Sequence, residues 1–300
     1  MRGHIVPFIA AALLVSAVPV FAGDDSLVTL HGGGLVGSSE LGAADDDITS
    51  GFLGGTVNLG PFIVTGDQDW TNRDFELGGD ADFSTITGAA VLQLLTSDYV
   101  DIAAHGAYAD GSIDFSGGGD RDYSMFRVGG DLSINFARIL GFDLESSGIG
   151  LYGSSGYVKV KDGFAPDTTM TGFYSTSGLA FDATDAITLC VDGGYANLAG
   201  DGAPDFDYWE VGGGIKIDAG DVLGLERSGA ALHGDVHYGD VARSGDDDQN
   251  LTIQAGVSFA LGTPVIDRHA LMAFSSDSRV EGCDFGALVP MIDRRLKFAF

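Results

Sequence analysis

The sequence predicts an all-β fold, a closed antiparallel transmembrane β-barrel of twelve strands. Three observations support this prediction. Apolar and polar residues alternate with period two in segments of about 9–14 residues, the pattern of strands with two different faces. Clusters of Gly, Asp, Ser and Asn separate these segments. Beyond the N-terminal leader, no apolar run is long enough for a membrane helix.

The N-terminal leader has the parts of a secretory signal peptide. Arg2 supplies a positive start, an apolar stretch covers residues 5–20, and Val20-Phe21-Ala22 forms a cleavage site before Gly23. A membrane anchor helix is the alternative, but the apolar stretch falls short of the roughly 20 residues that a span requires. We therefore expect residues 1–22 to be removed and the mature chain to be exported.

The mature chain is strongly acidic. Removal of the leader takes away one base, Arg2, and leaves 14 bases against 43 acids, a net charge of −29. This charge excludes nucleic acid as a partner, because its phosphates require a basic surface, and it favours cations. Cys190 and Cys283 are too few for a disulfide framework. A bond between them would hold the C-terminal tail inside the barrel as a plug.

The alternation defines the individual strands. In residues 205–218, for example, Trp209 and Ile215 lie on one face, and Glu210 and Lys216 lie on the other. Twelve is an even number, as closed bacterial barrels generally have. The predicted strands cover residues 26–37, 50–59, 61–66, 83–95, 98–110, 122–136, 148–161, 169–182, 185–198, 205–218, 229–240 and 250–262.

A soluble β-sandwich is the alternative fold, because its strands alternate as well. The apolar face, however, carries aromatic residues near both ends of single strands, such as Phe173 and Phe181. At ~3.3 Å per residue and a tilt of about 40°, eight to ten residues span roughly 20–25 Å, the expected separation of two interfacial girdles. The residues expected to face outward include Phe126, Phe136, Val211, Ile215 and Ile253.

With its leader, its alternating strands and its aromatic terminus, the chain resembles the broad, porin-like class of Gram-negative outer-membrane β-barrels. Leu296, Phe298 and Phe300 have the spacing of the aromatic-ended terminal strand in that class. The resemblance implies an outer-membrane location with membrane lipid as a partner, and a barrel over residues 23–262.

The C-terminal residues depart from the pattern of that class. Phe259 and Leu261 already complete a last strand, and residues 263–300 follow. This tail is a periplasmic extension, a partial plug, or a thirteenth and fourteenth strand. Twelve strands are favoured over fourteen because Arg294 would otherwise face lipid, at a cost of a few kcal/mol near the midplane.

The predicted connections indicate an orientation. Outer-membrane barrels place short turns in the periplasm and longer loops outside. One set of connections carries most of the loop acids, so we expect it to lie outside the cell. It includes residues 38–49 with Asp45–Asp47 and residues 241–249 with Asp246–Asp248.

The inward face combines acids, bases and histidines. Its five acids and three bases give a net charge of −2 with neutral histidines, so the lumen favours cations. The predicted pore-lining residues are Asp101, His105, Arg127, Asp131, Lys159, Asp192, Glu210, Lys216, His233, Asp235 and His237.

One inward cluster, His233-Gly234-Asp235-Val236-His237, has residue types that bind zinc or activate water. No second-strand ligand can be assigned, so no metal, cofactor or catalytic residue is predicted. The acidic loops match no calcium-binding motif.

Three functions remain open. The first is a narrow passive pore for small hydrophilic solutes with a mild cation preference. The second is a structural or surface-interaction barrel. The third is an outer-membrane hydrolase that uses the His233–His237 cluster. The sequence predicts neither the transported solute nor the oligomeric state.

Overall fold

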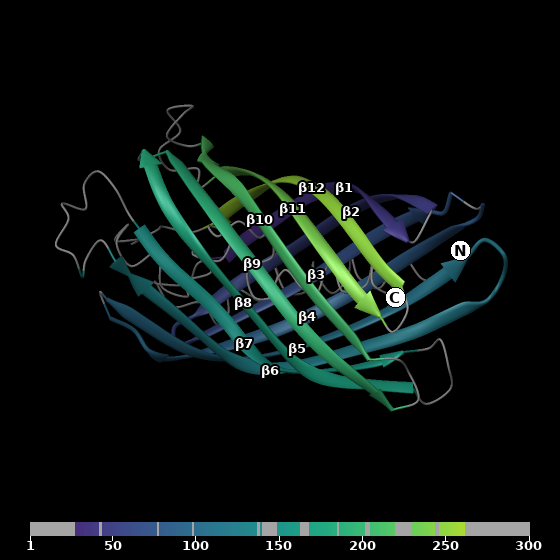
Figure 1. Ribbon diagram of the computed structural model, residues 1–300. Helices are drawn as coiled ribbons and strands as arrows, with labels where there is room; N and C mark the ends of the chain where they lie inside the picture. Colours follow the sequence, from purple (N-terminus) through teal and green to yellow (C-terminus); the bar gives the residue numbers. More distant parts are fainter. Residues whose placement is uncertain are drawn as a thin grey trace.

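The computed structural model describes residues 28–41, 44–76, 78–97, 99–136, 139, 149–162, 168–184, 186–201, 205–219, 230–243 and 246–261. The predicted signal peptide, residues 1–22, and the tail, residues 263–300, lie outside these ranges. The described residues form a twelve-stranded antiparallel barrel (Figure 1). Its strands are β1 (Val28–Leu41), β2 (Ala44–Leu59), β3 (Phe62–Asp74), β4 (Asp80–Leu95), β5 (Val100–Phe115), β6 (Asp120–Asn135), β7 (Ile149–Asp162), β8 (Thr168–Thr184), β9 (Ile187–Asp201), β10 (Phe206–Asp218), β11 (Ala230–Arg243) and β12 (Asp246–Leu261).

The barrel closes where its first and last strands pair. β1 pairs antiparallel with β2 on one side and with β12 on the other. The predicted number of twelve strands is confirmed. The fourteen-strand alternative is wrong, because β1 and β12 pair directly and leave no open edge for a further strand.

The stagger of the strands sets the width of the barrel. The stagger is found by stepping from each residue to its paired residue on the next strand, starting at Val28 of β1 and going once around the barrel. The last step reaches Asp247 of β12, and the register of β12 with β1 matches Asp247 to the position one residue after Leu41. The path therefore returns 14 residues from its start, at position 42. Strands about 4.8 Å apart and tilted by about 40° then give a backbone diameter of about 24 Å.

The strands extend further at one end than the sequence predicts. We call the end at which β1 begins and β12 ends the base, and the opposite end the tip. At the tip, Asp45–Asp47 lie in β2 and Asp246–Asp248 lie in β12, and not in the expected loops. Backbone pairing with the neighbouring strands satisfies the main chain here, and it outweighs the low strand propensity of aspartate.

The connection lengths also differ from the expectation. The tip connections are short, as at residues 42–43 and 244–245, whereas the two longest, residues 136–148 and 219–229, lie at the base. Loop length therefore does not indicate which end of this barrel faces the cell exterior. The expectation that the tip faces the cell exterior remains a prediction and rests on the acidic residues of the tip.

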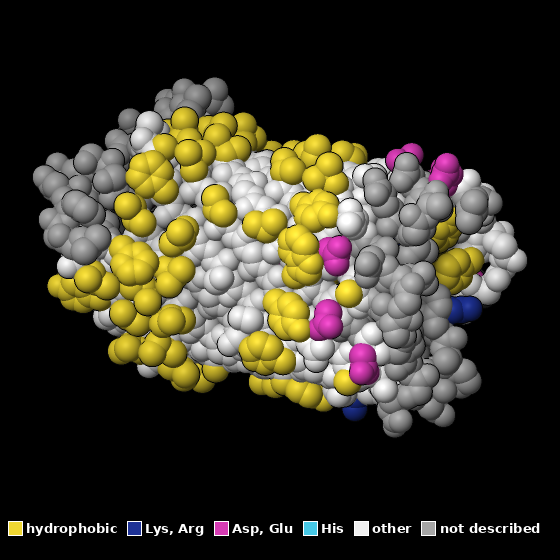
Figure 2. Space-filling model, viewed as in Figure 1, with side chains coloured by type: hydrophobic (Ala, Val, Ile, Leu, Met, Phe, Trp, Pro, Cys, Tyr) yellow, Lys and Arg dark blue, Asp and Glu magenta, His cyan; other side chains and the backbone are white. Residues whose placement is uncertain are grey.

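The outer surface carries two bands of exposed apolar side chains, separated by a strip of small residues (Figure 2). Acidic side chains lie beyond the second band, toward the right of that view. The band near the base is mainly aliphatic and includes Phe62, Leu92, Ile102, Leu132, Leu189 and Leu232. The band near the tip is mainly aromatic and includes Tyr108, Phe126, Tyr157, Phe173, Tyr195 and Trp209.

These bands distinguish a membrane barrel from a soluble sandwich. Val211, Ile215 and Ile253 are 39–50% exposed, as expected, and Phe136 is half-buried. Apolar bands of this extent on the outside match lipid and not water. Within the described ranges, no helix has the length and apolar character that a membrane crossing requires.

Candidate functional site: the inner wall of the barrel

The structure places ten of the eleven predicted pore-lining residues on the inner face. Alternation along each strand points their side chains into the lumen, where all except Lys216 are buried. These ten are Asp101, His105, Arg127, Asp131, Asp192, Glu210, Lys216, His233, Asp235 and His237.

Lys159 is the exception, and its inward assignment is wrong. Its neighbours Val158 and Val160 are buried on the inner face, and Lys159 pairs across strands with the outward-facing Phe126. The preceding run Gly153-Ser154-Ser155-Gly156 has no apolar side chain that could show which face of the strand is which.

Sequence reasoning missed a further group of inward charges. Residues 67–82 were expected to form a loop, but β3 continues to Asp74 and turns Asp67, Asp69 and Arg73 into the lumen. Both faces of this segment are polar, so its alternation was weak. Trp70, which faces outward, was the available signal.

The inner wall is more acidic than the sequence indicated. Eight carboxylates are buried there against two buried arginines, which gives the buried groups a net charge of −6 with neutral histidines. The acids are Asp46, Asp67, Asp69, Asp101, Asp131, Asp192, Glu210 and Asp235.

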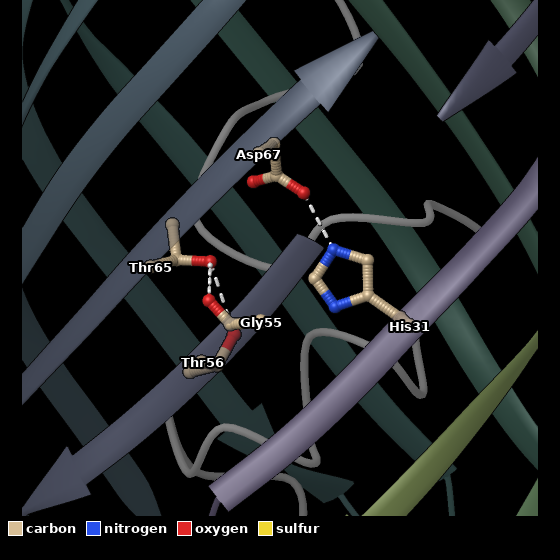
Figure 3. Close-up of polar contacts among 5 residues, drawn as sticks. All are labelled: His31, Gly55, Thr56, Thr65 and Asp67. Carbon is tan, nitrogen blue, oxygen red and sulfur yellow. Dashed lines mark hydrogen bonds and ion pairs between the residues drawn. The ribbon is translucent and has the colours of Figure 1, made fainter. Parts of the chain in front are cut away.

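The first of three polar clusters joins β1, β2 and β3 (Figure 3). His31 Nε2 lies 2.5 Å from Asp67 Oδ1. Beside this pair, the hydroxyls of Thr56 and Thr65 are 3.0 Å apart, and Thr65 also donates to the carbonyl oxygen of Gly55 at 3.1 Å. These contacts satisfy groups that have left water, as burial requires.

The second cluster joins β5, β6 and β8. His105 Nδ1 lies 2.9 Å from Asp131 Oδ2, and its Nε2 contacts the hydroxyl of Tyr174. The guanidinium carbon of Arg127 lies 5.4 Å from the centre of the Tyr174 ring. A cation over an aromatic ring contributes about 0.5–2 kcal/mol, more when it is desolvated.

The third cluster contains the predicted His233–His237 segment. His237 lies between Asp192, 3.5 Å from Nδ1, and Asp235, 3.3 Å from Nε2. His233 Nε2 is instead 2.9 Å from Ser258 Oγ. The two histidines contact different residues, and no group of three His, Cys, Asp or Glu side chains in the described ranges is placed to hold a metal ion.

A buried ion pair joins β1, β2 and β3, the strands of the first cluster, near the tip. Arg73 Nε donates to Asp46 Oδ2 at 2.8 Å, and its Nη2 donates to Ser39 Oγ at 3.2 Å. The guanidinium thereby connects β3 to β2 and β1. Its charge-assisted hydrogen bonds are the stronger kind.

Comparison with known proteins identifies the fold. No protein-family model matches the sequence, and no curated protein sequence matches it. Among solved structures, the translocator domain of autotransporter NalP from Neisseria meningitidis has 13% identity, covering 85% of this chain and 95% of that chain, with a TM-score of 0.51. An outer-membrane channel from Pseudomonas putida F1 has 9% identity, covering 80% and 97%, with a TM-score of 0.52. The β domain of the Bordetella autotransporter BrkA has 12% identity, covering 79% and 100%, with a TM-score of 0.51.

The chain has the fold of an outer-membrane β-barrel. At these identities the similarity establishes the fold, and the lipid-matching bands agree with it. The expected outer-membrane location is confirmed on this basis.

The inner wall of this outer-membrane barrel is not uniform along its length. Toward the tip, one sector carries a buried apolar cluster instead of charges. β3 and β12, by contrast, present mainly polar side chains to the lumen. The apolar cluster consists of Ala109, Met125, Val158, Val160, Met170, Tyr174, Ala196, Leu198, Tyr208 and Val241.

Proposed function

We propose that the protein is a narrow passive pore for small hydrophilic solutes with a mild preference for cations. The observation that carries this proposal is the surplus of acids on the inner wall, where eight carboxylates are buried against two arginines. Charge of one sign along a confined path concentrates ions of the opposite sign and repels those of the same sign.

β3 and β12 supply a polar lining for such a path. An ion in a narrow lumen loses part of its hydration shell, and wall oxygens replace the lost water. On β3 the inward residues after Ile63 are Thr65, Asp67, Asp69, Thr71 and Arg73. On β12 the buried inward residues are Asn250, Thr252, Gln254 and Ser258.

The width of the barrel supports a narrow path. Barrels of eight strands are filled by side chains, and those of sixteen to eighteen enclose an aqueous channel. Twelve strands, with a backbone diameter of about 24 Å before side chains are subtracted, lie between these cases. One structure with the same fold is described as an outer-membrane channel, which favours conduction here.

Selectivity measurements on purified, refolded protein test the proposal. We expect reversal potentials in planar bilayers to show a cation preference that grows at low salt, because the Debye length is about 8 Å at physiological ionic strength. One charge about 10 Å from an ion contributes about 0.4 kcal/mol in water, or about two-fold. Glu210→Gln and Asp235→Asn should each lower the cation-to-anion permeability ratio by about this factor.

Asp122→Asn is the matched control, because Asp122 is exposed on the outer face of β6 and its charge does not face the lumen. It should leave the permeability ratio close to that of the unchanged protein. Anion preference at low salt would contradict the proposal.

A structural barrel is the second candidate, and the burial of the inner wall favours it. His237, Thr252 and Leu198 are 0% exposed although they face the lumen. Absence of conductance from protein whose folding has been verified would support this reading over the pore.

A further inference from the structure

Lys159 and Lys161 lie together on the outer face of β7. They are two residues apart, so their side chains leave the strand on the same side, about 7 Å from each other. Val158 and Val160, which alternate with them, are buried on the inner face. Among the side chains that the structure describes, no other base lies on the outer face of the barrel. The two lysines therefore form the one basic patch of the described outer wall.

This patch lies at the mainly aromatic band near the tip. Lys159 is paired across strands with Phe126, and Tyr157, two residues earlier on β7, is paired with Phe173. The three aromatic side chains belong to that band and are 44–50% exposed. Aromatic bands of membrane barrels mark the level of the lipid headgroups. Both ammonium groups can reach this level, because a lysine stem lies along apolar surface while its charge stays in polar surroundings.

Hydroxyl groups flank the two lysines. Lys161 is paired with Ser124 of β6 and with Thr169 of β8. Lys159 is paired with Thr171 of β8. All three hydroxyl-bearing residues face outward and are half-buried. The patch thus offers two ammonium groups and three hydroxyls as donors, and the oxygens of a phosphate group accept hydrogen bonds from both kinds.

The protein does not neutralise either ammonium group. No hydrogen bond or ion pair joins Lys159 or Lys161 to any residue that the structure describes. Asp122, on the outer face of β6 two residues before Ser124, forms no ion pair with them either. A positive charge at the edge of a membrane attracts anionic headgroups, by about five-fold in binding for each lysine.

We propose that Lys159 and Lys161 bind the anionic phosphate headgroup of a membrane lipid. The ammonium groups and the neighbouring hydroxyls contact the phosphate. The acyl chains of the same lipid pack on Tyr157 and Phe173, which lie on the membrane side of the lysines. A free phosphate ion would lack these apolar contacts, so the patch fits a lipid. The site lies on the outside of the barrel and does not depend on conduction through the lumen.

Lipid retention by purified, refolded protein tests the site. Native mass spectrometry from a neutral detergent detects lipids that stay bound when phosphatidic acid, or phosphatidylcholine with the same acyl chains, is added. We expect the protein to retain phosphatidic acid in preference to the zwitterionic phosphatidylcholine. Lys159→Gln and Lys161→Gln should each weaken that retention about five-fold, and the double substitution should weaken it further. Equal retention of the two lipids, or unchanged retention by the double variant, would overturn the proposal.

Arg121→Gln is the matched control for the loss of one positive charge. Arg121 lies near the tip on the neighbouring strand β6, but it pairs with the buried Ile113, and its guanidinium carbon is 5.3 Å from the centre of the Phe115 ring. This variant should retain phosphatidic acid as the unchanged protein does. An equal loss would show that net charge governs binding, and would overturn the site.

Inorganic phosphate separates a lipid from a free anion. At the same concentration as the lipid, it should not displace phosphatidic acid from the unchanged protein, because it makes no contact with the aromatic side chains. Displacement by inorganic phosphate would overturn the lipid as the occupant and assign the two lysines to a free anion.

Discussion

At the scale of single residues, glycines make room for the buried polar clusters. A Cβ on Gly54 would overlap His31 and Asp67, and one on Gly129 would overlap Tyr174. The inner wall thus alternates large polar side chains with positions that carry none. His31 and Asp67 can meet across β2 because Gly54, which lies between them on that strand, has no side chain.

Gly212 gives a prediction about this packing. A Cβ there would lie within 3 Å of three atoms of the His237 ring, which is 0% exposed and flanked by Asp192 and Asp235. The ring has no free space, so Gly212→Ala should destabilise the barrel by about 1–3 kcal/mol. Urea unfolding in detergent or lipid vesicles measures this change.

Gly88→Ala is the control for that substitution. Gly88 also lies within a strand, but nothing is within 4 Å of a Cβ added there. Equal unfolding free energies for the two variants would contradict the packing explanation.

At the scale of elements, the strands do more than cross the apolar bands. They continue past the aromatic band, and at the tip Arg73 joins β3 to Asp46 of β2 and Ser39 of β1. Removing one partner of a buried pair costs about 3–5 kcal/mol, which is a reason for the tip to remain ordered beyond the membrane.

The orientation of the strands can be tested by labelling. Gly117 lies in the connection between β5 and β6 at the tip, and Thr96 lies in the connection between β4 and β5 at the base; both are exposed. If the acidic tip faces outward, an impermeant thiol reagent on intact cells should label Gly117→Cys and not Thr96→Cys. Both should react in permeabilised cells, and the opposite pattern on intact cells would reverse the orientation.

At the scale of the whole molecule, polarity is inverted relative to a soluble protein. Large apolar side chains such as Leu53, Ile86 and Val191 are 48–61% exposed, while Asp131, Arg127 and His237 are at most 4% exposed. Only a solvent that is itself apolar makes this distribution favourable, because burying charges while exposing hydrocarbon costs free energy on both counts in water.

Two arginine substitutions on one strand test this embedding. Val191 lies on the outer face of β9, after Leu189 of the band near the base and before Tyr195 of the band near the tip, and Ala199 lies on the same face near the tip. Val191→Arg should cost about 2–4 kcal/mol and Ala199→Arg about 0–1 kcal/mol in lipid vesicles, because the penalty depends on depth. Similar costs would show that the membrane does not lie where the apolar bands place it.

The sequence by itself determined the fold class, the number of strands and most inward positions. Side chains alternate between the two faces of every strand, and membrane lipid requires apolar residues on the outer face. The sequence of a single strand therefore shows which residues face outward wherever its outer face is apolar and its inner face is polar. Phe126, Val211 and Glu210 could be assigned for that reason. The assignment failed at Lys159 and at residues 67–82, where neither face offered that contrast.

Only the tertiary structure decided which inward groups meet. His31 and Asp67 lie 36 positions apart, and His105 contacts Tyr174 across 69 positions. Such contacts depend on the register between strands and on the 14-residue stagger of the closed barrel, to which all twelve pairings contribute. A local pattern specifies the face of a strand; the closure of the whole sheet specifies the partners on that face.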